Sequence, residues 1–498
     1  MRPGANVTSG LAYEEPLIFE LSRPGRVGYS LPASDVPAVD PAEVLGADHV
    51  RSDDPVLPEL SEVDVVRHFT RLSTWNAAVD LGLYPLGSCT MKYNPRVNEK
   101  LARLPGFAGG HPLQPAALSQ GFLELMVELE NQLAEVSGMD RVSLQPAAGA
   151  QGELAGIMMI RAYHEQRGEH RSVVLVPDSA HGTNPASAAL NSYDVETIPS
   201  GDDGILHPDA VSRAMTPEVA GIMLTNPNTL GLFEEHVARI CEIVHAKGGL
   251  VYGDGANLNA LMGIARPGDL GIDVMHFNLH KTFSTPHGGG GPGSGPVGVK
   301  NLLAPFLPVP MVRRLADSEG GGFGLDYEFP HSIGRLHGNF GNVGMFVRAF
   351  AYLRSLGPNG LRRCSEMAVL NANYLLARLR DVYHVAYDRP VMHECVLSDR
   401  NLEPTGITTM DVAKRLIDYG YHPPTIYFPL IVHGAIMIEP TESESLEGLD
   451  RFVETLRAIE REAREEPQLV RDAPHRTPHS RLDETRAARH PVLRWQPD

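Results

Sequence analysis

One lysine in this 498-residue chain has surroundings that are unusual for a charged surface residue. Lys281 lies in the stretch HFNLHKTFSTPHGGGGPGSGPVGVK (276–300), where apolar residues lead into it and glycines follow it. This pattern places the lysine where a strand ends and an irregular turn begins, and the glycines allow backbone or a ligand to come close. An ordinary lysine is a solvated charge. We therefore treat Lys281 as a candidate reactive amine.

The elements that would position this lysine are short apolar runs, each of which ends in polar residues. They are VSLQPAAGAQG (142–152), SVVLVPDSAHGTNPA (172–186), AGIMLTNPNTLG (220–231), GLVYGDGANLNA (249–260) and VMHFNLHKTFS (274–284). Segments of crossover length separate them, which predicts an α/β fold with a parallel sheet covered on both faces. Such sheets bind ligands beyond the carboxyl ends of their strands. One pocket is therefore expected to collect Gly149, Asp178, His181, Asn226, Asp254 and Lys281.

A second segment offers a place for a phosphate. In PAAGAQGELAGIMMI (146–160), Gly149, Ala150 and Gln151 stand at the start of a predicted helix, whose free N–H groups and dipole favour an anion. Taken alone, these residues also fit a tight turn. The G-x-G-x-x-G match at 293–298 is weaker, because it leads into a predicted strand and a dinucleotide site must open a helix. HEQRGEH (164–170) has the wrong spacing for zinc, so no metal is expected.

Together, these groups meet the requirements of pyridoxal 5'-phosphate (PLP). That cofactor needs an amine for a Schiff base, a carboxylate at its pyridine nitrogen and a cradle for its phosphate. Asp254 would keep the pyridine nitrogen protonated and so make the ring an electron sink, while Lys281 would supply the amine. His181 could stack on the ring, although a lone histidine is more often a capped or surface imidazole.

Several longer motifs extend these positions. They are DSAHGTNPASA, MLTNPNTLG, YGDGANLNA, NLHKTFSTPHGGGGPGSGPVGVK and HPPTIYFPLIVHGAIMIEPTESES, with SRLDETRAARHPVLRW in the tail. In these motifs the chain resembles glycine decarboxylase, the P-protein of the glycine cleavage system, and specifically the second, PLP-bearing subunit of its two-subunit form. The resemblance implies that Lys281 is the Schiff-base lysine, Asp254 the pyridine partner and His181 the stacking residue.

The same resemblance implies further site residues and a fold. The phosphate loop is matched by Gly149, Ala150 and Gln151, and the other expected cofactor contacts are Thr225, Ala256 and His280. The loop LYPLGSCTMKYNP (83–95) is expected near the active site, with Ser88, Cys89, Thr90 and Lys92 as candidates. The implied fold is the fold type I PLP-dependent transferase-like architecture, with a mostly parallel seven-stranded sheet in a large domain and a smaller C-terminal α/β domain.

The family also implies a reaction and partners. The enzyme would decarboxylate glycine and pass the remaining aminomethyl group to the lipoyl arm of the H-protein, working with a homologous first subunit. The glycine-rich segments 287–295 and 320–324 could give that arm access. Two alternatives stay open: another fold type I amino-acid decarboxylase that needs no lipoylated partner, and a non-catalytic paralogous subunit, against which Lys281 argues. Arg335, His337 and His433 receive no substrate role.

Composition agrees with a cytoplasmic enzyme. The chain has 61 acidic against 43 basic residues, a net charge of −18, and no basic tract, which argues against binding to nucleic acid. Its four cysteines, Cys89, Cys241, Cys364 and Cys395, show no paired metal spacing and fit reduced thiols. The N-terminus has no apolar signal core, and the longest apolar run (426–438) is too short to span a membrane.

The pattern of the chain also suggests domain divisions. We expect an N-terminal arm with the active-site loop (1–115), a large PLP-binding domain (116–330), a small C-terminal domain (331–465) and a tail (466–498). Helices are predicted over 121–136, 343–356, 361–382 and 408–420. A further helix is expected to open at Thr441, because Glu444 follows it in capping-box spacing.

Overall fold

The computed structural model describes residues 15–53, 55–285 and 293–495. The chain divides into two compact units, one formed by the residues up to Ala78 together with those from Ala473 onward, and the other by Val79–Asp472. The domain boundaries expected at 115, 330 and 465 stay predictions. Most of the glycine-rich segment 287–295, expected to give access to the site, lies outside the described residues.

The first unit contains the helices α1 (Pro41–Leu45), α2 (Glu62–Ser73) and α14 (Glu484–Arg489). Helix α2 begins at a capping box, in which Ser61 and Asp64 satisfy each other's backbone N–H groups. Glu15 is held against this helix by His68 at 2.8 Å and by Arg71. The aromatic rings of Phe19 and Trp495 stack at 4.8 Å, so the first and last described segments meet in this unit.

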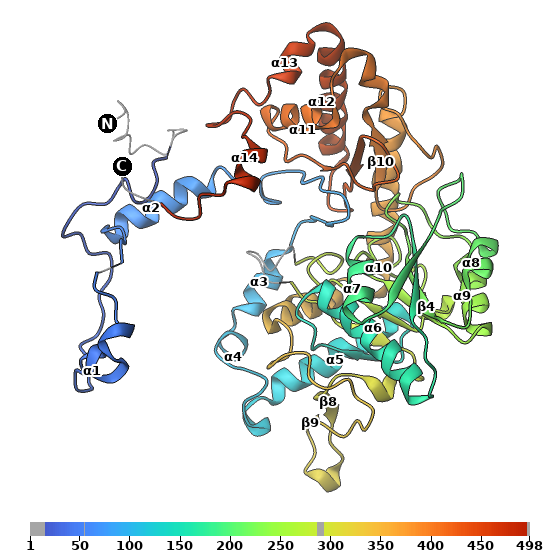
Figure 1. Cartoon of the computed structure of the whole chain (residues 1–498), viewed down its shortest axis with the longest axis horizontal. Coiled ribbons are helices and arrows are strands. Elements are labelled where there is room, and N and C mark those ends of the chain that lie inside the picture. The colour runs from blue at the N-terminus through green and yellow to red at the C-terminus, as the bar shows by residue number, and fades with distance from the viewer. Residues whose placement is uncertain (1–14, 54, 286–292, 496–498) are drawn as a thin grey trace. The chain divides into compact units, whose positions relative to one another are not determined.

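A seven-stranded sheet organises the second unit (Figure 1). Its strands are β1 (Arg141–Ser143), β2 (Val173–Pro177), β3 (Asp194–Ile198), β4 (Val219–Thr225), β5 (Leu250–Asp254), β6 (Val274–His276) and β7 (Val297–Val299). Their order is β1-β7-β6-β5-β4-β2-β3, and β7 runs antiparallel to both of its neighbours while the others are parallel. The expected mostly parallel seven-stranded sheet is confirmed.

Helices cover both faces of this sheet. Alternate strand residues belong to two separate apolar clusters, because successive side chains in a strand point to opposite faces. One cluster joins residues such as Val174 and Met223 to α6 (Gly149–Gln166) and α7 (Thr183–Leu190). The other joins Leu175 and Ile222 to α5 (Gln120–Ser137), α9 (Val237–Ala246) and the first half of α10 (Val343–Leu379). Helices α3 (Arg96–Ala102), α4 (Pro105–Ala108) and α8 (Pro208–Ala214) complete this part.

A smaller antiparallel sheet follows, in the order β10-β12-β11. Its strands are β10 (Cys395–Ser398), β11 (Thr425–Ile426) and β12 (Ala435–Ile438). They share an apolar core with the second half of α10 and with α11 (Thr409–Asp418), α12 (Leu446–Glu465) and α13 (Pro467–Arg471). Helix α10 is broken at Gly357, where φ is 60°, so its halves correspond to the two helices expected on either side.

One local expectation was wrong. Helix α12 begins at Leu446 rather than near Thr441, because Ser445 provides the cap and accepts from the Gly448 N–H at 3.1 Å. Thr441 instead has a left-handed φ of 63°. A two-stranded antiparallel sheet of β8 (Met311–Arg314) and β9 (Phe323–Asp326) lies between the large sheet and α10 in the sequence. None of the helices in the described parts of the chain combines the length and apolar character that crossing a membrane requires.

Candidate active site

A cavity of about 220 Å³ lies at the carboxyl ends of the parallel strands. Its lining draws on the starts of α6 and α7, the ends of β4, β5 and β6, and a loop that precedes α3. The predicted site residues that it brings together are Ser88, Gly149, Ala150, His181, Thr225, Asp254, Ala256, His280 and Lys281. A site at this edge of the sheet is where open α/β folds bind ligands.

The other predicted residues do not line this cavity. Gln151 turns back to cap its own helix, since its Oε1 accepts from the Ala147 N–H at 2.7 Å. Asp178 follows β2 but bonds Ser200 at 2.6 Å. The neighbours of Ser88 in the loop, which are Cys89, Thr90 and Lys92, stand behind the lining. Burial raises the pKa of the Cys89 thiol, so it is neutral at physiological pH.

Lys281 follows β6 and reaches across the cavity to the active-site loop. Its Nζ donates to the backbone carbonyl of Ser88 at 2.8 Å, although the two residues are 193 positions apart in the sequence. The side chain is half-buried. A primary amine held by a neutral carbonyl at the wall of a cavity is available to a bound carbonyl compound.

Asp254, the last residue of β5, is the buried carboxylate of the site. Its Oδ2 accepts from Asn184 at 3.0 Å and its Oδ1 from the Ala256 N–H at 3.0 Å, while His276 Nε2 lies 3.7 Å away. Burial by itself would raise the pKa of Asp254, but His276, these hydrogen bonds and Lys281 outweigh it and lower the pKa. The carboxylate is therefore ionised at neutral pH and can hold a proton on a ligand nitrogen.

A second carboxylate stands behind Asp254. Glu153 in α6 accepts from Asn184 and from Thr183, both at 2.8 Å, and Thr183 in turn bonds the His181 ring at 2.9 Å. Burial and the nearby Asp254 raise the pKa of Glu153 to about 7. Glu153 thus bonds the first two residues of α7, of which Thr183 contacts His181 and Asn184 contacts Asp254, so it fixes His181 and Asp254 relative to each other.

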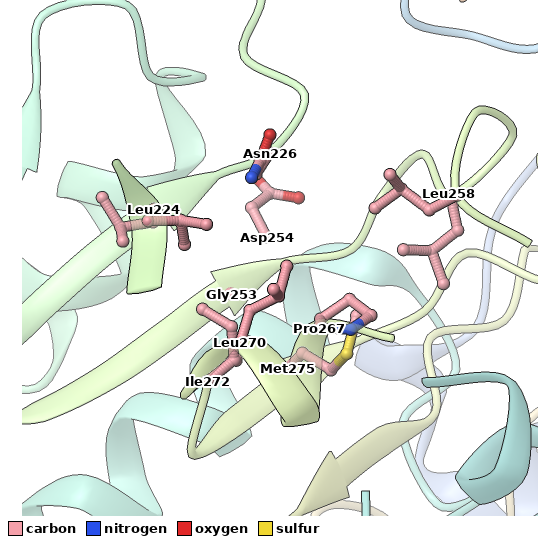
Figure 2. Close-up of a pocket in the computed structure, with 11 residues that line it drawn as sticks. Leu224, Asn226, Gly253, Asp254, Leu258, Pro267, Leu270, Ile272 and Met275 are labelled. Atoms are coloured by element: carbon pink, nitrogen blue, oxygen red, sulfur yellow. The ribbon is translucent and has the colours of Figure 1, made fainter. Parts of the chain in front are cut away.

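The far side of Asp254 is apolar. A small cavity of about 20 Å³ lies there, and Figure 2 shows side chains that line it, such as Leu224, Leu270 and Ile272, with Asp254 and Asn226 as polar members of the lining. Asn226, expected in the ligand pocket, lines this small cavity instead. The apolar backing explains why burial opposes ionisation of Asp254 and why polar partners on the other side are needed.

The start of α6 fits a phosphate on two observations. A Cβ on Gly149 would come within 2.3 Å of Asn278 Oδ1, so only glycine leaves the helix terminus open here. Among the described residues, Asn278 Oδ1, Thr225 Oγ1 and His393 Nδ1 are buried at the cavity without a hydrogen-bond partner. Buried polar atoms normally have partners, so a polar ligand such as PLP fits this lining.

Gly149→Ala is expected to weaken PLP binding by about tenfold or more, because crowding a packed site costs about 1–3 kcal/mol. Absorbance titration of the cofactor-free chain with PLP measures the effect. Gly121→Ala in α5 is the matched control, since a Cβ there meets no atom within 4 Å. Equal affinities of the two variants would show that the start of α6 does not hold the phosphate.

Several site residues were missed from the sequence. His276, Asn278 and His280 occupy every second position of HFNLH. In an extended chain this spacing puts their side chains on one side, which could have identified His276 and Asn278. Glu153 lies in a helix that otherwise reads as apolar on this face. His393 and Glu394 directly precede β10 and Glu439 directly follows β12, and no short-range signal links them to Lys281.

Comparisons with known proteins agree with this geometry. Residues 34–323 match the family model for the glycine cleavage system P-protein, and residues 364–477 match that for the glycine dehydrogenase C-terminal domain. The chain is 55% identical over 484 residues to the probable glycine dehydrogenase (decarboxylating) subunit 2 of Bacillus licheniformis, covering 97% of this chain and 99% of that protein. It is 57% identical over 480 residues to the protein of the same name from Caldanaerobacter subterraneus, covering 96% and 98%.

Solved structures show the same fold at low sequence identity. A glycine decarboxylase (P-protein) of the glycine cleavage system, in inhibitor-bound form, matches with a TM-score of 0.69 and 23% identity, over 84% of this chain and 93% of that one. A NifS-like protein matches with a TM-score of 0.59 and 16% identity, over 76% and 99%. The expected fold type I architecture is confirmed.

Proposed function

Because the chain belongs to the P-protein family of the glycine cleavage system, we propose that it decarboxylates glycine on PLP and transfers the remaining aminomethyl group to the lipoyl arm of the H-protein. The chain is a PLP-dependent glycine dehydrogenase (decarboxylating). One observation carries the proposal: a lysine amine held by a backbone carbonyl, an ionised buried carboxylate and an open helix start face a single cavity.

Each of these groups has a role at one end of the cofactor. Lys281 would hold PLP covalently, Asp254 would keep a proton on its pyridine nitrogen, and the N–H groups at Gly149 would face its phosphate. When bound, PLP supplies an electron sink for the pair left as CO2 departs. His181 lines the cavity and is fixed by Thr183, which supports a place for its ring beside the cofactor.

We also propose that the chain works with a homologous first subunit. Its relatives carry the designation subunit 2, which supports such a partner. Large apolar side chains exposed in the arm, such as Leu31, Val39 and Leu57, are 71–78% accessible and would gain from burial against another chain.

The experiment that tests this function is exchange of labelled CO2 into the carboxyl group of glycine. The chain is co-expressed with the first subunit, loaded with PLP and assayed with lipoylated H-protein. We expect exchange that depends on the lipoyl group, because the proposed reaction passes the aminomethyl group to that acceptor. The matched control is H-protein without its lipoyl group, which offers the same protein surface and no acceptor.

Two results would contradict the proposal. Rapid decarboxylation of another amino acid without H-protein would identify the chain as a different fold type I decarboxylase. A chain that binds PLP but exchanges no CO2 with any amino acid would favour the non-catalytic subunit. The cavity position of Lys281 argues against that second reading, because a non-catalytic subunit has no use for a reactive amine.

A further inference from the structure

Two buried glutamates of the small sheet lie beside Lys281. Strands β10 and β12 are antiparallel with Cys395 opposite Ile438, so Glu394 and Glu439 follow as the next facing pair. Their side chains are 1% and 0% exposed, and their carboxylate oxygens lie, with a ring nitrogen of His393, within 4.8 Å of one another. Like charges placed opposite each other in a sheet are destabilising.

The pair holds the active-site loop in place. Glu394 accepts from the Ser88 N–H at 2.7 Å, and Glu439 accepts from the Thr90 N–H at 3.0 Å. Ser88 and Thr90 have left-handed φ values of 60° and 49°, which side-chain-bearing residues adopt only when the surroundings enforce it. The Ser88 carbonyl also accepts from Lys281, so Ser88 connects Glu394 of the pair to the reactive amine through its hydrogen bonds.

The local charges require a proton on the pair. The groups that face it are Lys281, His393 and Cys89. Burial and Lys281 lower the pKa of His393 to about 3, and burial raises the pKa of Cys89, so both are neutral. Burial, and then Glu439, raise the pKa of Glu394 to about 8, and burial raises that of Glu439. Within the ranges that the structure describes, Lys281 is therefore the one cation that faces the two carboxylates. It can balance one negative charge, and a proton shared by Glu394 and Glu439 removes the other.

We propose that Glu394 and Glu439 share a single proton, and that Glu394, which lines the cavity, delivers it to the sulfur released from the lipoyl disulfide. Glu439 is a positioning residue that keeps the proton on the pair. This inference rests on the proposed function. A proton fits this place better than a metal cation, because two backbone N–H groups already donate to these oxygens and the charge of Lys281 acts on them.

The step balances without any further reagent. The electron pair left by loss of CO2 forms the new carbon–sulfur bond, the sulfur–sulfur bond breaks, and its electrons leave on the second sulfur. The proton from Glu394 neutralises that thiolate. The pair regains a proton from the ammonium group of the next glycine, which must lose one to react. A donor with a pKa near that of a thiol suits this transfer.

His393 provides an independent reason to expect that a polar ligand group binds at this end of the cavity. It is 2% exposed, it lines the cavity directly before Glu394, and its Nδ1 has no partner among the described residues. A buried ring nitrogen of this kind is costly unless a ligand group meets it. Such a group at His393 also lies beside Glu394, whose Oε1 is 3.7 Å from the other ring nitrogen.

Infrared titration of the full-length chain in its complex with the first subunit tests the shared proton directly. The protonated-carboxyl band assigned to Glu394, as the difference between the wild type and Glu394→Gln, is expected to disappear with a midpoint near pH 8. The sign follows from the raised pKa, since the folded protein keeps this proton up to a pH at which an unfolded glutamate has lost it. Glu439→Gln should move the midpoint to lower pH by removing the like charge.

The activity arm uses the same variants. Glu394→Gln, which can still accept from Ser88, should bind PLP normally yet transfer the aminomethyl group about 10²–10⁴-fold more slowly, because it cannot release a proton. Wild-type transfer should fall as pH rises through about 8, and the residual rate of Glu394→Gln should be flat there. The control is Glu130→Gln in α5, another buried carboxyl with a pKa raised by burial but far in sequence from the site.

The proposal would be overturned if Glu439→Gln left the midpoint pH of the Glu394 band unchanged. It would also be overturned if Glu394→Gln transferred the aminomethyl group as fast as Glu130→Gln. These outcomes are separate from failure of the proposed function. A wild type inactive on glycine would refute that function whatever the carboxyl band shows. An active wild type with no titrating band near pH 8 would refute only the shared proton.

Discussion

Lys281→Ala is expected to give a folded chain that holds no covalently bound PLP and has no glycine activity above background. The reason is that a covalent link to PLP needs an amine in the cavity, and the alanine variant removes the one supplied by Lys281. The fold should survive, because the side chain is half-buried and its bond to Ser88 contributes about 1.5–3 kcal/mol at most. Borohydride reduction followed by peptide mapping measures the adduct.

Lys247→Ala is the matched control for this experiment. Lys247 follows α9, is exposed and does not line the cavity, so its removal should leave the borohydride adduct and the activity unchanged. An adduct of undiminished yield in Lys281→Ala, mapped to another lysine, would refute the assignment of the reactive amine. Reversible binding of PLP by the variant would still be consistent with it, because Asp254 and the start of α6 remain.

Lys92→Met is expected to lower the free energy of unfolding by about 3–5 kcal/mol, because it strands a buried carboxylate. Lys92 is 1% exposed, and its Nζ bonds Asn259 at 2.8 Å, Tyr352 at 3.0 Å and Glu442 at 2.8 Å. These partners come from the segment after β5, from α10 and from the segment after β12. Chemical denaturation measures the loss, and a weakened hold on the Ser88 loop should reduce activity as well.

The effect should depend on pH. Burial would raise the pKa of Glu442, and Lys92 outweighs it and lowers that pKa in the native protein. Without Lys92 the raising effect remains, so the variant should lose stability as pH rises above the ordinary glutamate value of 4.5. Adding Glu442→Gln should recover part of the loss. Lys100→Met, the same change at an exposed position in α3, should shift stability by less than about 0.5 kcal/mol.

The large sheet and one end of the site were predictable because their signals are local. Apolar runs such as 219–225 and 250–254 end in polar residues, and parallel strands bring those ends to one edge. The sequence pattern alone therefore predicted that Lys281 and Asp254 lie in the same site. The predicted start of α12 was wrong because both Thr441 and Ser445 carry a hydroxyl group that can cap a helix. Only tertiary packing decides which of them does so.

The other end of the site could not be predicted in this way. Glu394 and Glu439 look like ordinary charged residues at the ends of short strands, and what distinguishes them is burial against a loop some 300 residues earlier. Nothing in the residues near Ser88 indicates its left-handed backbone, which side chains rarely adopt without outside support. Such features depend on contacts that only the folded chain makes.

Hydrogen bonds to Glu394 and Glu439, beside the small sheet, hold Ser88 and Thr90 and so determine when the site forms during synthesis of the chain. The two hydrogen bonds span 306 and 349 residues, so the loop cannot take its working shape until the ribosome has released most of the chain. Earlier segments, including Lys281 and the large sheet, emerge first. A nascent or prematurely terminated chain would thus carry its amine without the loop that completes the site, and catalytic competence is acquired last.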